Sequence, residues 1–97
     1  MSFKKCKFYT MMLNRKKMKI EAVQQEGYTD SEFYYYKVKY SNNVIKWFCV
    51  EPSTGCSVCE ANTRLEAYKE KERMIDAIRE KDKTKMIQKF NELLEAV

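Results

Sequence analysis

The chain has 97 residues, of which 44% are hydrophobic and 34% are charged, and its net charge is +5. This length allows one domain, residues 1–97, and this composition excludes a disordered tail and a membrane protein. Histidine is absent and only two glycines are present. These absences exclude imidazole-dependent catalysis, histidine-ligated metals and a glycine-rich phosphate loop.

The first residues do not read as a secretory signal, because Lys4 and Lys5 are not followed by an apolar segment. No part of the chain approaches the length of about eighteen apolar residues that a membrane-spanning helix needs. We therefore expect a soluble, cytoplasmic protein without membrane contact, in which the cysteines are reduced thiols.

The N-terminal residues predict a β-hairpin over residues 3–24. Residues 3–13 alternate loosely between two faces, 14–16 have the composition of a turn, and 17–24 alternate well between apolar and charged residues. The segment from Gly27 to Ser31 is predicted as a loop.

Three further strands are predicted over residues 33–60. The segments 33–40 and 44–50 are rich in aromatic and β-branched residues, and the turn between them contains two asparagines, which tolerate positive φ. Residues 52–55 form a second turn, after which 56–60 complete an antiparallel meander.

The remainder, residues 63–97, contains no glycine or proline and consists mainly of helix-forming residues. Thr63 and Glu66 have the spacing of a capping box, which predicts a helix start at this point. The apolar stripe lapses near Asp82, so the segment is either one long helix or two, and two are favoured. The sequence thus predicts an α+β fold: an antiparallel sheet of four to five strands over residues 3–60, then one long or two consecutive helices over 64–96 packed on the sheet.

The positive charge is unevenly distributed. Residues 1–20 contain seven basic residues and no acidic ones, so the whole excess lies in the predicted hairpin. Aromatic residues such as Tyr9 lie among these cations, and aromatics can stack on bases while cations neutralise phosphates. The residues predicted to contact a partner or nucleic acid are Lys4, Lys5, Lys7, Tyr9, Arg15, Lys16, Lys17, Lys19, Lys37, Lys39 and Lys46.

Three interpretations of this hairpin remain open from the sequence. Lysines at a sheet edge protect against aggregation, and the same cations suit nucleic acid or an acidic protein surface. Two interpretations are likewise open for the aromatic stripe of Tyr34, Tyr36 and Tyr40, a stacking platform or a core face. The core face is favoured because a small sheet needs large buried residues.

The cysteines allow a metal site as an alternative. Cys56 and Cys59 form a C-x-x-C pair that could bind zinc together with Cys6 and Cys49. We favour buried reduced thiols without any cofactor, because two such pairs are typical of zinc sites and because a strand would point Cys56 and Cys59 to opposite faces. No catalytic motif is present, so we expect no enzyme activity.

A resemblance to a known family rests on the run from Trp47 to Val50, the turn at 53–55 and the helix start from Thr63 to Ala67. This order looks like the sheet-plus-helix DNA-binding domain of phage integrases and covers residues 33–80. In that family the sheet enters the major groove, so the resemblance implies contacts from Lys37, Lys39 and Lys46.

The small size, the single domain and the richness in Lys, Asn, Tyr and Ile resemble short phage and mobile-element proteins of the anti-CRISPR, or anti-defence, type. That resemblance implies stoichiometric binding to a host nuclease complex in the host cytoplasm.

Taken together, these features predict a non-catalytic binding protein whose partner is a protein or ribonucleoprotein with an acidic or nucleic-acid-containing surface, as for an inhibitor of a defence nuclease. The alternative is direct binding of DNA or RNA by the hairpin and sheet. The apolar stripe from Met86 to Val97 either docks on the sheet or pairs with a second copy in a homodimer.

Overall fold

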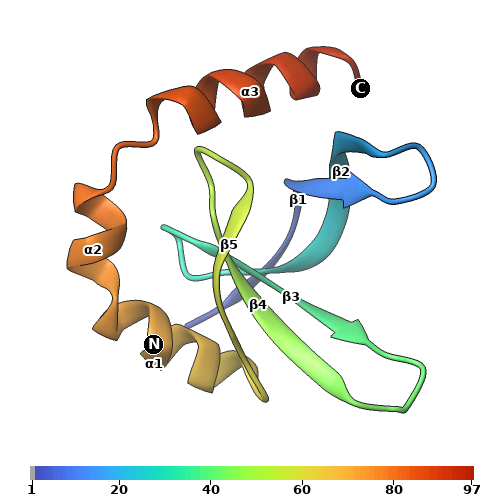
Figure 1. Ribbon diagram of the computed structural model, residues 1–97. Helices are drawn as coiled ribbons and strands as arrows, with labels where there is room; N and C mark the ends of the chain where they lie inside the picture. The colour runs from blue at the N-terminus through green and yellow to red at the C-terminus, as the bar shows by residue number, and fades with distance from the viewer. Residues whose placement is uncertain (1) are drawn as a thin grey trace.

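A computed structural model describes residues 2–97 as a five-stranded antiparallel meander followed by three helices (Figure 1). The strands lie in the sheet in chain order. Their bounds are β1 Lys4–Asn14, β2 Lys19–Thr29, β3 Tyr34–Lys39, β4 Ile45–Glu51 and β5 Cys56–Ala61. The helices are α1 Arg64–Arg73, α2 Ile75–Glu80 and α3 Thr84–Glu95. The predicted α+β class, with a sheet followed by C-terminal helices, is confirmed.

The prediction for the second strand was wrong at both ends. β2 starts at Lys19 and continues to Thr29, through the segment predicted as a loop. Gly27 looked like a turn residue, but it serves a close backbone approach: a Cβ at this position would lie 2.0 Å from the carbonyl oxygen of Tyr35 on β3. A glycine inside a strand often marks such an approach.

The sheet curls, so that one of its faces encloses a small core. Phe8 of β1 stacks on Tyr34 of β3, with the ring centroids 4.5 Å apart, and Tyr36 stacks on Phe48 of β4 at 5.5 Å. The Met11 amide of β1 also donates to the Gly55 carbonyl in the β4–β5 turn, 2.8 Å away. The predicted core role of Tyr34 and Tyr36 is therefore confirmed. For Tyr40 the prediction was wrong, because this residue follows the end of β3 and is 45% exposed.

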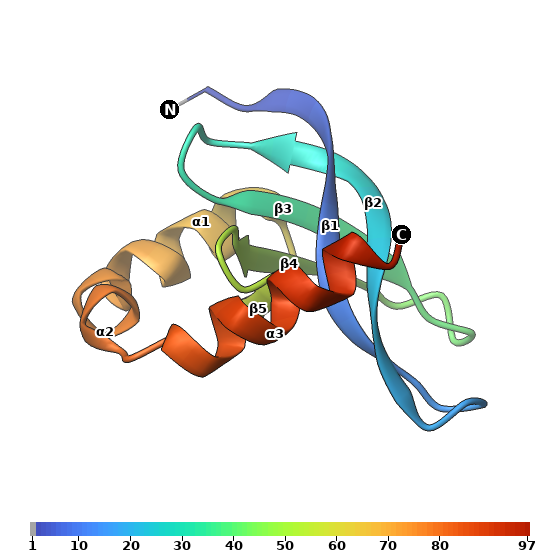
Figure 2. The ribbon, with the colours of Figure 1, turned by 90° about the horizontal axis from the view of Figure 1, so that it is seen from above.

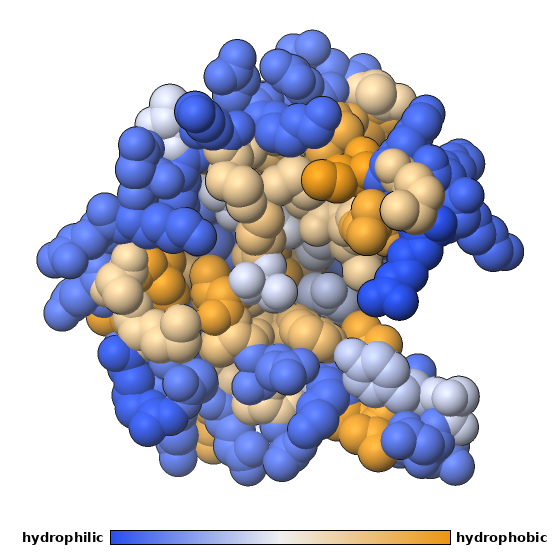
Figure 3. Space-filling view, in the orientation of Figure 1, coloured by the Kyte–Doolittle hydropathy of each residue, from blue (hydrophilic) through white to orange (hydrophobic). Residues whose placement is uncertain are grey.

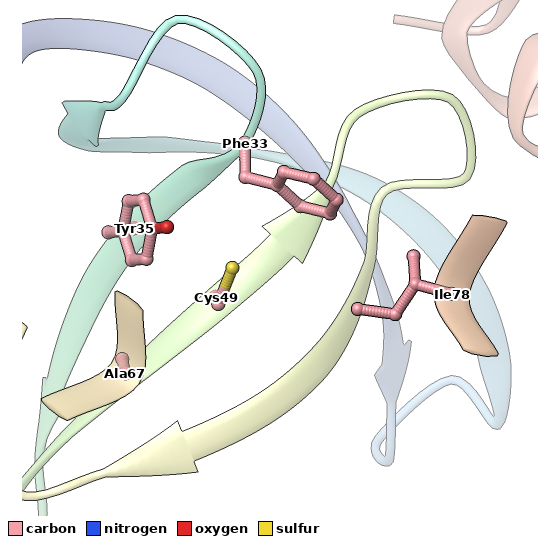
Figure 4. Packing of buried hydrophobic residues seen from close by; sticks show 5 residues of the cluster. All are labelled: Phe33, Tyr35, Cys49, Ala67 and Ile78. Carbon is pink, nitrogen blue, oxygen red and sulfur yellow. The ribbon is translucent and has the colours of Figure 1, made fainter. Parts of the chain in front are cut away.

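The opposite face of β3, β4 and β5 packs against α1 and α2. Tyr35 of β3 and Cys49 of β4 have no exposed surface and belong to one cluster with Ala67 of α1 and Ile78 of α2. Figure 4 shows these side chains together with Phe33, the residue directly before β3. The aromatic and aliphatic residues of the alternating strands supply most of this buried area.

A buried ion pair joins α1 to the β2–β3 turn. The Lys71 Nζ lies 3.0 Å from Asp30 Oδ2, and the two side chains are 2% and 3% exposed. Burial by itself raises the pKa of Asp30, but hydrogen bonds from the Tyr35 hydroxyl, from two backbone amides and from Lys71 outweigh it and leave the pKa below its ordinary value. Burial likewise lowers the pKa of Lys71, and its bonds to Asp30 and Glu72 outweigh that effect and raise it.

The helical part begins where the capping box predicts. The Thr63 hydroxyl accepts a hydrogen bond from the Glu66 amide at 3.1 Å, which satisfies one of the free donors of the first turn. The chain leaves helical geometry at Met74 and again at residues 81–83, and the second break lies at the predicted place near Asp82. The break at Met74 was not predicted.

The last helix, α3, crosses the β1–β2 hairpin (Figure 2). Its buried residue is Phe90, whose ring occupies the space that a side chain at Gly55 would fill, 2.5 Å from the position of a Cβ. Hydrophobic side chains gather where α2, the β4–β5 turn and α3 surround the middle of this face, and hydrophilic ones form the rim (Figure 3). Within residues 2–97, no helix is long and apolar enough to span a membrane.

Candidate nucleic-acid interface

An open groove of about 580 Å³ lies where the start of α1 meets β2, β3 and β4. We call it the aromatic groove. Its lining residues are Phe3, Glu26, Gly27, Tyr28, Lys37, Trp47, Thr63, Arg64 and Leu65. The groove combines three aromatic rings with two cations, which is the composition of a surface that stacks planar groups and neutralises anions.

Arg64 is the central side chain of this groove. Its guanidinium carbon lies 4.0 Å from the centroid of the Tyr28 ring and 4.4 Å from that of Phe3. Cation–π contacts of this kind hold the planar guanidinium in place. Within residues 2–97 no carboxylate lies close enough to Arg64 to form an ion pair, so its N–H donors are available to an anion.

Trp47 and Lys37 continue the groove on β4 and β3. The two residues are paired across the strands, and the Lys37 Nζ lies 5.8 Å from the centroid of the indole ring. The indole is also 6.0 Å from the Tyr28 ring, at an interplanar angle of 48°. The Arg64 guanidinium carbon also lies 5.8 Å from the centroid of the indole, so a base that stacks on Trp47 would have both cations nearby.

A second, shallower hollow of about 320 Å³ adjoins the aromatic groove and shares Glu26 and Gly27 with it. Lys5 and Lys7 of β1 border this hollow. Lys7 lies 3.7 Å from Glu26, but both side chains are mostly exposed, and such a pair is weak in water. Lys5 and Lys7 thus continue the positive surface of the groove onto β1.

Local features of the sequence place these side chains. The Thr63 cap starts α1, which makes Arg64 the first residue of the helix. Tyr28 is paired with Tyr35 across β2 and β3, so it lies on the same face of the sheet as the residues under α1. Gly27 leaves the floor of the groove without a side chain, and therefore the β3 backbone can come close.

The eleven residues predicted to contact a partner fall into separate parts of the molecule. Those at the groove or its neighbouring hollow are Lys5, Lys7 and Lys37. Those in or beside the turn of the β1–β2 hairpin are Arg15, Lys16, Lys17 and Lys19. Lys4 and Tyr9 lie on β1, Lys39 lies at the end of β3, and Lys46 of β4 donates to Asn62 at 2.8 Å. The charged hairpin is therefore not one patch.

Four residues of the groove were missed by the site prediction: Phe3, Tyr28, Trp47 and Arg64. Two of them did carry a local signal, because Phe3 lies among lysines and Trp47 is the only tryptophan of the chain. Tyr28 was assigned to a loop and Arg64 was given no role beyond the start of a helix, and only their contact in the folded chain distinguishes them.

The four cysteines do not come together. Cys49 and Cys59 face each other across β4 and β5, whereas Cys6 packs against the enclosed core on the other side of the sheet. The hydrogen bond to Cys59, together with burial, raises the pKa of Cys49. The same hydrogen bond lowers the pKa of Cys59 and outweighs the opposite effect of burial there. Within residues 2–97 no three His, Cys, Asp or Glu side chains are placed to share a metal ion.

No protein-family model, no curated protein and no solved structure matches this chain. Its function must therefore follow from the chemistry of its own surface. The aromatic groove brings three aromatic rings, the cations Arg64 and Lys37 and one carboxylate, Glu26, to a single hollow, and rings beside cations can bind a planar anionic ligand such as a nucleotide.

Proposed function

We propose that the protein is a non-catalytic binding protein that takes unpaired nucleic acid, free or exposed in a ribonucleoprotein, into the aromatic groove. The stacking of Arg64 on Tyr28 and Phe3, beside Trp47, carries this proposal. A base would stack on Trp47, and Arg64, Lys37 and Lys5 would neutralise phosphates. Because every base has a flat face, this mode of binding selects little for sequence.

Binding without chemistry suits a stoichiometric inhibitor, and we propose inhibition of a host defence nuclease as the biological use. This use is supported by the resemblance in size and composition to anti-defence proteins and by a groove that could cover a guide or target strand. An acidic protein surface is the second candidate partner, since four closely spaced cations at the hairpin turn, Arg15 to Lys19, have one nearby acid, Glu21.

The experiment is a titration of the protein with a single-stranded twelve-nucleotide thymidine oligomer, followed by the fluorescence of its single tryptophan. Trp47 lines the groove, so stacking there should quench its emission directly. Neutralisation of about three phosphates gives a log–log salt slope near −2, so affinity should fall about 20-fold between roughly 50 and 200 mM salt.

Two variants make the test specific. Arg64→Gln should weaken binding about tenfold and make the salt slope shallower by about 0.7, because one cation is lost. Lys85→Gln on the exposed side of α3 removes one positive charge elsewhere and should leave binding within about twofold. Absence of quenching at low salt, or an unchanged affinity of Arg64→Gln, would overturn the assignment to the groove.

A further inference from the structure

The turn of the β1–β2 hairpin has a fixed shape. It comprises Arg15 to Met18, between the paired residues Asn14 and Lys19. The Asn14 side-chain oxygen accepts hydrogen bonds from the Lys16 and Lys17 amides at 3.1 and 3.2 Å. Figures 1 and 2 show this turn at the side of the molecule opposite α1 and α2, extending past the body of the sheet. The turn would therefore lose little conformational entropy on binding.

Met18 is an unusual residue for its position. Its φ is +51°, in the left-handed region that glycine and asparagine occupy at least cost. Its side chain is 76% exposed, so it contributes little to the core. Neither the backbone conformation nor burial explains a methionine here, and a strained residue at an exposed turn points to a contact outside the chain.

The surroundings of Met18 combine apolar and basic side chains. Leu13 and Ile20 are paired across the strands and are 54% and 47% exposed. The four cations of the turn, Arg15, Lys16, Lys17 and Lys19, are all exposed. One ion pair reduces this charge, between Lys17 and Glu21 at 3.6 Å. Exposed apolar side chains and exposed cations therefore occur together at this end of the hairpin.

We propose that this turn enters the minor groove of B-form DNA, with Met18 as an apolar wedge between base pairs and the four cations on the flanking phosphates. The inference rests on the proposed function in taking nucleic acid as the partner, but it concerns a different part of the molecule and a double-stranded ligand. Proteins that bend DNA insert Met, Leu, Ile or Phe from the minor groove in this way.

Two observations favour DNA over other partners. Three of the four cations are lysines, which are depleted in protein–protein interfaces but suit phosphates. The tip of the turn, rather than the whole two-stranded ribbon, would enter the minor groove, which is about 6 Å wide in B-form DNA and could hold this tip from both sides. The minor groove of an RNA duplex is wide and shallow and would not.

The test uses a DNA duplex with a central TA step, which kinks easily, and a 2-aminopurine in that step, whose emission rises when it is unstacked. Binding of the unaltered protein should raise this emission several-fold. Met18→Gly relieves the unfavourable φ, so it should fold at least as well as the unaltered protein. It should also keep its salt-dependent affinity within about threefold and lose the emission change.

Val44→Gly is the matched control, because Val44 is an exposed apolar residue beside the turn of the neighbouring β3–β4 hairpin. It should behave like the unaltered protein. The proposal is overturned by absence of duplex binding, by an emission change that persists in Met18→Gly, or by equal affinity for an RNA duplex. It is also overturned if anionic vesicles or an acidic protein such as ovalbumin compete with DNA for the turn.

The two sites can be separated by the variants. If thymidine oligomers fail to quench Trp47 while the duplex response depends on Met18, the groove assignment fails and the wedge is supported. If quenching depends on Arg64 and the duplex response is absent, the wedge fails and the proposed function is retained.

Discussion

Replacement of Lys71 by methionine would remove one charge of the buried pair while keeping the length of the side chain. The Lys71 Nζ lies 3.0 Å from Asp30 and 3.1 Å from Glu72. It also lies 4.8 Å from the centroid of the Phe33 ring and 4.5 Å from that of Tyr68. In the Lys71→Met variant, Asp30 would stay buried without its counter-charge.

Loss of one member of a buried ion pair costs about 3–5 kcal/mol. Asp30 would keep hydrogen bonds from the Tyr35 hydroxyl and from the Glu32 and Phe33 amides, so we expect the lower end, about 3 kcal/mol. A chain of 97 residues has a total stability of about 5–15 kcal/mol. The melting temperature should therefore fall by about 12–24 °C, at about 4–8 °C for each kcal/mol.

The measurement is urea unfolding at neutral pH, followed by circular dichroism. Lys69→Met on the exposed side of the same helix is the control and should cost less than about 0.5 kcal/mol. The double variant Lys71→Met with Asp30→Asn should recover part of the loss, because no unpaired charge is then buried. A cost below about 1 kcal/mol for Lys71→Met would refute the expectation that the buried charge of Asp30 depends on Lys71.

Three further outcomes are expected. The pKa of Asp30 is lowered from 3.8, so its stabilisation is present above pH 3.8 and is lost as the pH falls through the lower folded pKa. The pKa of Lys71 is raised from 10.5, so its stabilisation is lost as the pH rises through the higher folded pKa. Urea titrations at acid and at alkaline pH should show neither of these losses in the double variant. Thr63→Ala should cost about 1 kcal/mol in the same assay by removing the helix cap, and an unchanged midpoint would mean that the cap contributes nothing. Gly27→Ala should cost more than about 2 kcal/mol or prevent folding, because its Cβ would overlap the Tyr35 carbonyl; a stable variant with the native circular dichroism spectrum would contradict the close approach of β2 and β3.

Local chemistry made much of the fold predictable. Alternation in the segments 33–40 and 44–50 predicted β3 and β4, and the asparagines between them predicted a turn in which Asn43 has a φ of +65°. The Thr63 hydroxyl predicted the start of α1 within one residue. These signals act between residues close in the chain, so they can be recognised without knowledge of the rest.

The failures have a common physical cause. Gly27 was assigned to a loop because glycine is common in turns, whereas the requirement at this position comes from the backbone of β3. Nothing in the pattern of α1 marked Lys71 as buried, since its partner Asp30 lies in the β2–β3 turn. In both cases the deciding contact is with a residue from another element.

The sequence alone determined the α+β class, the excess of positive charge and its position within the first twenty residues. Only the tertiary structure decided that this charge is divided between the two ends of the β1–β2 hairpin. The reason is that β1 is eleven residues long, so its ends lie roughly 30 Å apart. The tertiary structure likewise decided that Arg64 stacks on Phe3 and Tyr28. Strand register and helix docking bring these three residues together, and both depend on the packing of the whole chain.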